Sequence, residues 1–117
     1  MIISFSKNYR YYVYRGATDM RKGFDGLCGL VHNEFLMSPL SGDVFIFFNN
    51  RRDRVKILHW QGDGFAIFHK RLEKGTYEIP PENASAKKAE IEASTLQFIL
   101  DGIVLSSIKK KRRFIHT

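Results

Sequence analysis

Residues 44–72 constrain the fold of this chain more than any other segment. The run 43–48 concentrates β-branched and aromatic side chains, which favour a strand, and residues 54–60 have the character of a returning strand. The triplet 62–64, Gly-Asp-Gly, then turns the chain into a third strand over 65–72, because Asp-Gly supplies the positive φ that hairpin turns require. Two consecutive hairpins predict an antiparallel meander.

Two further segments predict helices that cover this meander. Apolar residues recur at helical spacing over 19–35, and Thr18 is placed to cap the first turn of that helix. Ser94 and Gln97, three residues later, have the spacing of a capping box. This box predicts a shorter helix over 95–101, which Gly102 ends in the way that glycine ends many helices.

Short strands are also expected at 11–14, 76–79 and 88–93, where strand-favouring residues are bounded by turn chemistry. We therefore expect one α+β domain over residues 1–108. Its mainly antiparallel sheet, a β-meander, is packed by one long and one shorter helix. Residues 109–117 follow as a basic C-terminal tail.

Charge points to a polyanionic partner. The chain has 19 Lys and Arg residues against 12 Asp and Glu residues, a formal net charge of +7. This surplus favours encounter with nucleic acid, although a basic surface that serves only solubility is an open alternative. The single cysteine, Cys28, excludes an internal disulfide and fits a reducing, cytoplasmic compartment. No apolar run reaches the roughly 18–20 residues that span a bilayer, so no membrane segment is expected.

The second hairpin carries the sharpest geometric prediction. Side chains alternate between the faces of a sheet, and cross-strand neighbours share a face. A two-residue turn and a four-residue turn both group the same side chains on one face: Lys56, Leu58 and Trp60 with Ile67, His69 and Arg71, extended by Arg54. This face suits phosphate contacts by its cations and stacking by Trp60. In the alternative interpretation, Leu58 and Trp60 belong to the core and the cations project from its rim.

The first hairpin leaves its register open. A four-residue loop would place Phe45 and Phe47 beside Arg54 and Lys56, and a five-residue loop would reverse that placement. Core packing is the expected role of these phenylalanines. Tyrosines 11, 12 and 14 could stack on bases or pack in an edge strand.

Other cations complete the candidate nucleic-acid interface. Arg51 and Arg52 occupy an exposed loop tip suited to backbone contacts. Lys70 and the tail residues Lys109, Lys110, Lys111, Arg112 and Arg113 add nonspecific, salt-sensitive affinity. Arg21 and Lys22 at the start of the first helix would offer a further anion site, but the charge of Asp19 argues against it.

Nothing in the sequence assembles a catalytic constellation, so we expect no enzyme, cofactor or metal site. His59 and His69 fall on opposite faces of the predicted hairpin, which argues against a metal pair. Asp19, Asp53 and other scattered aspartates lie at caps and turns, where structural roles account for them.

Four motifs in order carry a family resemblance: 19–27, 53–60, 62–65 and 70–75. Together they resemble the TnpB accessory proteins, the second open reading frame products of insertion sequences of the sixty-six type, over residues from about 15 to 103. The resemblance implies a noncatalytic role in DNA transposition, beside a separate transposase and a second accessory protein of the same element. His59, Gln61 and the residues beyond Ser106 depart from the family pattern.

The sequence is therefore compatible with two main functions. The first is an accessory protein that binds element DNA through the basic sheet face and tail. The second is an adaptor that assembles the transposase complex through exposed aromatic surface, without recognising DNA directly. A metal-dependent nuclease is a third and weaker hypothesis.

Overall fold

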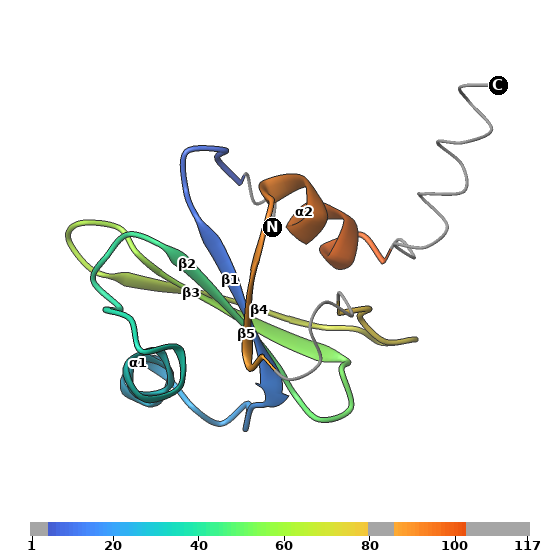
Figure 1. Ribbon diagram of the computed structural model, residues 1–117. Coiled ribbons are helices and arrows are strands. Elements are labelled where there is room, and N and C mark those ends of the chain that lie inside the picture. Colours follow the sequence, from blue (N-terminus) through green and yellow to red (C-terminus); the bar gives the residue numbers. More distant parts are fainter. Residues whose placement is uncertain (1–4, 80–85, 103–117) are drawn as a thin grey trace, which may run out of the picture.

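The computed structural model describes residues 5–79 and 86–102. A five-stranded sheet has the order β4-β3-β2-β1-β5, with α1 and α2 on opposite sides (Figure 1). The elements in chain order are β1 (Tyr11–Ala17), α1 (Phe24–Leu30), a π-helical turn η1 (Val31–Phe35), β2 (Val44–Phe48), β3 (Arg54–Trp60), β4 (Phe65–Arg71), β5 (Lys88–Ile91) and α2 (Ala93–Leu100). The predicted meander is confirmed as β2, β3 and β4, which pair antiparallel in succession.

Strand β1 lies inside the sheet, where it pairs parallel with β2 and antiparallel with β5. The expected turn behind residue 14 is absent from this strand, which continues to Ala17 through a register shift after Tyr14. A Cβ at Gly16 would lie 2.6 Å from the Tyr14 ring, so only glycine lets that ring fold over the backbone. The edge-strand interpretation of the tyrosines is therefore wrong: Tyr11, Tyr12 and Tyr14 are buried in an interior strand.

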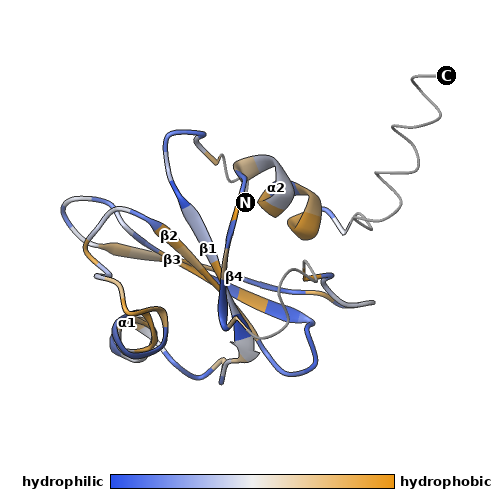
Figure 2. Ribbon diagram, viewed as in Figure 1, coloured by the Kyte–Doolittle hydropathy of each residue, from blue (hydrophilic) through white to orange (hydrophobic). Residues whose placement is uncertain are grey.

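Alternation along the strands produces two hydrophobic cores, one on each face of the sheet. Figure 2 shows hydrophobic residues concentrated on the central strands and helices and hydrophilic residues in the connecting loops. The core under α2 contains Tyr11, Val13, Val44, Ile46, Phe48, Val55, Ile57, Tyr77, Leu96, Ile99 and Leu100. The core under α1 contains Tyr12, Tyr14, Leu27, Val31, Phe35, Phe45, Phe47 and Leu58.

The long helix predicted over 19–35 is shorter than expected. It begins at Phe24, with extended Gly23 at its N-cap and no side-chain cap, so Thr18 caps nothing. Asp19 explains the late start, because its carboxylate accepts a hydrogen bond from the Arg21 amide at 2.9 Å and holds the chain in a turn. The helix ends through η1, after which Leu36 adopts a left-handed conformation with φ +55°.

Two further predictions need correction. Residues 76–79 form no strand; instead, the Tyr77 amide donates to the Arg52 carbonyl at 2.6 Å, which satisfies the backbone without a ladder. The capping box at Ser94 is also wrong, because only Glu92 separates β5 from α2 and therefore occupies the N-cap. The strand expected over 88–93 is confirmed as β5 but ends at Ile91, because α2 begins at Ala93. Gly102, with φ +76°, follows the end of α2 as predicted.

Candidate nucleic-acid interface

The second hairpin has the predicted arrangement of side chains. Trp60 lies opposite Phe65, so the turn spans residues 61–64, and its left-handed residue is Gly62 at φ +92° rather than Gly64. Down the ladder, the pairs on one face are Leu58 with Ile67, Lys56 with His69, and Arg54 with Arg71. The prediction that these side chains share a face is confirmed, as is the separation of His59 from His69.

The first hairpin extends the same face into the core. Phe47 lies opposite Lys56 and Phe45 opposite Leu58, so the phenylalanines share a face with the cations, as the four-residue loop predicted. The loop itself is longer than predicted, because the last pair is Phe48 with Val55 and residues 49–54 connect them. Phe45, Phe47 and Leu58 are fully buried under α1 and η1, so this part of the face is core, as the alternative interpretation held. Trp60 is only half-buried and packs edge-on against Phe65, with ring centroids 4.9 Å apart.

Beyond this core, the face is cationic. Arg54, Lys56 and Arg71 surround His69, and we name these four residues the cationic face. Burial lowers the pKa of His69, and the positive charges of its three neighbours lower it further, which keeps the imidazole neutral near pH 7. A depression of about 310 Å³ is lined by Arg54, His69, Arg71 and Glu73. The cations thus converge on one open surface.

Existing contacts leave much of this charge available. Lys56 Nζ donates to the Lys22 carbonyl oxygen at 2.8 Å, which fixes the lysine beneath the loop before α1. Arg71 pairs with Glu73 at 3.1 Å, but both side chains are more than half exposed, and such surface pairs contribute little. The Arg54 guanidinium makes no hydrogen bond to any other described residue.

Lys70 and Trp60 are separated from the cationic face. Lys70 points to the α2 side of the sheet, opposite Val55, and its Nζ lies 3.4 Å from the Leu100 carbonyl oxygen. Strand alternation requires this, because Lys70 neighbours Arg71 in sequence. Trp60 shares the face but lies four residues from Lys56, a separation of about 13 Å along a strand.

The loop between β2 and β3 is held rigid by Asn49. Its side-chain oxygen accepts from the amides of Asp53 and Arg54 at 3.1 and 2.9 Å, and its nitrogen donates to the Asp53 carboxylate at 2.6 Å. The Asn49 hydrogen bond is the main reason that the pKa of Asp53 is lowered. Arg51 and Arg52 are exposed at the loop tip as predicted, and Arg52 adopts φ +58°.

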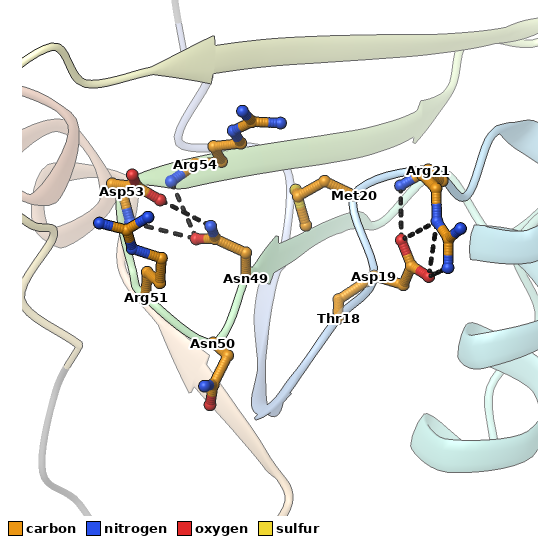
Figure 3. A pocket seen from close by; sticks show the side chains of 9 residues that line it. All are labelled: Thr18, Asp19, Met20, Arg21, Asn49, Asn50, Arg51, Asp53 and Arg54. Carbon is orange, nitrogen blue, oxygen red and sulfur yellow. Dashed lines mark hydrogen bonds and ion pairs between the residues drawn. The ribbon is translucent and has the colours of Figure 1, made fainter.

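A crevice of about 380 Å³ lies between this loop and the loop after β1 (Figure 3). We name it the loop crevice; its lining residues are Thr18, Asp19, Met20, Arg21, Asn49, Asn50, Arg51, Asp53 and Arg54. Residues 19–21 belong to the first family motif and residues 53 and 54 to the second, so the fold brings together motifs that lie about thirty residues apart in sequence. In the sequence, the only sign of this crevice is that both segments belong to family motifs.

The charge of Asp19 is neutralised by its neighbour Arg21. Its carboxylate accepts from the Arg21 amide and from the guanidinium, with the closest contact at 2.7 Å to Nη2 (Figure 3). The hydrogen bonds from Arg21 lower the pKa of Asp19 to about 2. Because Arg21 pairs with it, Asp19 opposes an anion at this place less than its charge alone predicts.

The remaining features that the sequence raises are the basic tail, a metal site and a membrane segment. The tail residues Lys109, Lys110, Lys111, Arg112 and Arg113 lie outside the described residues. In residues 5–79 and 86–102, no three His, Cys, Asp or Glu side chains gather into a metal-binding group. Neither described helix combines the length and the apolar character that crossing a membrane requires.

Comparison with known proteins decides the family. A family model described as "IS66 Orf2 like protein" matches residues 9–110. The chain belongs to this family. It is 32% identical over 106 residues to the uncharacterized protein y4jC of Sinorhizobium fredii, covering 91% of this chain and 89% of the relative. The uncharacterized protein y4hO of the same organism is 32% identical over 97 residues, or 83% of each chain.

No solved structure matches the chain. Membership of the IS66 Orf2-like family confirms the resemblance to the TnpB accessory proteins of insertion sequences. This IS66 Orf2-like protein is thus an accessory protein of insertion-sequence transposition.

Proposed function

We propose that this protein is a noncatalytic accessory factor that binds the DNA of its own insertion element. The cationic face makes the main phosphate contacts, with Arg51 and Arg52 at the loop tip and the basic tail adding affinity. The observation that carries the proposal is the convergence of Arg54, Lys56 and Arg71 around His69 on an open part of the sheet. In a cell, the transposase and the second accessory protein of the element are its expected partners.

The arrangement of these cations suits a DNA backbone better than a protein carboxylate. Their side chains point the same way from adjacent strands about 4.8 Å apart, so neighbouring phosphates of one strand can be contacted together. Close cations repel one another, and binding a polyanion relieves that repulsion. Each phosphate contact releases condensed counterions, which makes the binding strongly dependent on salt.

The test compares a duplex of the element's terminal repeat with a scrambled duplex of equal length, by fluorescence anisotropy at several salt concentrations. The double variant Lys56→Ala with Arg71→Ala should weaken binding. It should also reduce the slope of log K against log salt by nearly two, one for each lost phosphate contact. Preference for the terminal repeat would indicate recognition of the element end, whereas equal binding would indicate a nonspecific tether.

A matched control removes the same charge elsewhere. Lys7 and Lys87 are both exposed, lie outside the cationic face, and can be replaced together by alanine. This control should retain the wild-type salt slope within about half a unit, because general charge loss removes no phosphate contact. Unchanged affinity and slope in the Lys56 and Arg71 double variant would remove the cationic face from the mechanism.

A second candidate, the assembly adaptor, is favoured by one specific observation. Leu36 is 84% exposed and holds a left-handed conformation at the end of η1, and nearby Leu40 is 57% exposed. Large apolar side chains held in solvent are typical of protein contacts. An adaptor would comigrate with the transposase at salt that abolishes DNA binding, and Leu36→Asn would abolish the comigration while keeping a residue type that tolerates φ +55°.

A further inference from the structure

We infer that the loop crevice binds one unpaired nucleotide of DNA, with the phosphate on Arg51 and Arg54 and the base against Met20. This inference rests on the proposed DNA-binding function and adds a preference for DNA that carries a single-stranded segment. The loop crevice is distinct from the cationic face, but Arg54 lines both.

Charge balance supports a single phosphate. The lining includes three guanidinium groups, from Arg21, Arg51 and Arg54, and two carboxylates, from Asp19 and Asp53. Asp19 is paired with Arg21, and Asp53 accepts the hydrogen bond from Asn49. The surplus is one positive charge, which one phosphodiester neutralises. Arginine also presents its donors in a planar fork that matches phosphate oxygens.

The donors that would hold this phosphate are not engaged elsewhere. The side chains of Arg51 and Arg54 make no hydrogen bond to the other described residues, unlike those of Arg10, Arg21 and Arg71. Both arise from the β2–β3 loop region that Asn49 holds in place. A rigid base reduces the entropy lost when the guanidinium groups close on a ligand.

The size and floor of the loop crevice suit a base as well as a phosphate. Its volume of about 380 Å³ is sufficient for a small molecule, and the loop crevice is largely open to solvent, so a ligand could enter without rearrangement of the loops. Figure 3 shows the Met20 side chain directed into the space between the two loops, where its thioether can contact an aromatic ring. Asn50 lines the wall, and the Thr18 hydroxyl there has no hydrogen-bond partner among the described residues.

The nucleotide in the loop crevice would be unpaired, and Arg54, which lines both the loop crevice and the cationic face, would connect it to a bound duplex. A base inside a duplex is stacked and cannot enter a recess unless it leaves the stack. A duplex on the cationic face would instead reach Arg54 at one end of that face. A strand continuing past the duplex end would then meet the loop crevice directly.

The experiment measures binding of the full chain to three DNAs by fluorescence anisotropy: a blunt duplex, the same duplex with a short thymidine extension, and the same extension made of abasic residues. The abasic extension keeps the phosphates and lacks the bases. We expect the thymidine extension, on one strand or the other, to bind at least about fivefold more tightly than the abasic one, because base stacking is lost from the latter.

Substitutions locate the effect. Met20→Ala should remove most of the difference between the thymidine and abasic extensions and leave blunt-duplex binding nearly unchanged. Arg51→Ala should weaken binding of both extended duplexes, which keep the phosphate, more than it weakens binding of the blunt duplex, to which Arg51 adds affinity at the loop tip. Arg52→Asn is the matched control: it removes one charge from the next residue, which lies outside the loop crevice, and asparagine tolerates φ +58°. It should weaken binding to all three DNAs by the same factor.

The outcomes separate this inference from the proposed function. Equal affinity for thymidine and abasic extensions, with blunt duplex still bound, would overturn the inference alone. Failure to bind the blunt duplex, with the thymidine preference retained, would overturn the duplex-binding role of the cationic face and leave the loop crevice supported. Because Arg51 is exposed, Arg51→Ala keeps the test decisive even where Met20→Ala unfolds the chain.

Discussion

The two faces of the β3–β4 hairpin are covered differently, although successive residues of the same two strands supply both. On the α2 side, Val55, Ile57 and Phe68 join a core, and the one cation, Lys70, reaches the end of the covering helix. On the α1 side, Leu58 is core, but the strands continue into the cationic face. The difference lies in cover: α1 begins late, and the loop before it reaches only as far as the Lys22 contact with Lys56.

A covering helix thus divides one sheet face into a buried core and an exposed cationic surface. The part of the face under α1 and η1 is aromatic and buried, and the remainder presents cations to solvent. Packing should therefore dominate the response to substitution in the first part, and electrostatics in the second.

The largest expected effect is on the core under α1. Phe47→Ala should lower the free energy of unfolding by about 3–5 kcal/mol, because it opens a cavity where Phe47 contacts Tyr14 and Phe35. Urea denaturation measures this loss. Arg54→Ala, on the uncovered part of the same face, should change stability by less than about 0.5 kcal/mol. Equal losses in the two variants would contradict the division of this face.

Adjacent residues test the two sides of β4. Arg71→Ala should lower the salt slope of DNA binding by about one, and Lys70→Ala should leave it unchanged, because only Arg71 is on the cationic face. Lys70→Ala should instead cost up to about 1 kcal/mol of stability, through the lost contact with Leu100. A slope that falls equally in both variants would show that the tested DNA contacts both sides of the strand.

A smaller effect is expected at Tyr77, in the core under α2. Burial raises the pKa of its phenol to about 12, and its hydroxyl has no hydrogen-bond partner among the described residues. Tyr77→Phe should raise the free energy of unfolding by about 1 kcal/mol at pH 7. The wild type should also lose stability as the pH rises above 10 toward 12, since the unfolded phenol ionises first, and the variant should lack that Tyr77 contribution. A destabilised variant would indicate that the hydroxyl has a partner.

The smallest effect concerns His69 on the cationic face. Its pKa in the folded protein lies below the ordinary 6.5, so the unfolded chain binds the proton more readily. The free energy of unfolding should therefore fall as the pH decreases from 7 through 6.5 toward the folded-state pKa. His69→Gln should flatten this part of the stability profile, measured by urea denaturation at several pH values. An identical slope in the variant would mean that neither burial nor the three cations lowers the pKa of His69.

Local chemistry made much of this fold predictable. The strands of the meander, the position of β5 and the shared face of Lys56, His69 and Arg71 all follow from alternation and turn residues. The start of α1 did not follow, because helical spacing extends back to Asp19 but that carboxylate caps a turn with Arg21 instead. Competition between two local hydrogen-bonding patterns is hard to resolve from spacing alone.

The sequence by itself determined which residues alternate, where the chain turns, and which family the protein belongs to. Only the tertiary structure decided that β1 lies inside the sheet beside β2, and that residues 18–21 meet residues 49–54 to form the loop crevice. The reason is physical: alternation and turns depend on neighbours in the chain, whereas the pairing of β1 with β2 depends on burying both sheet faces at once.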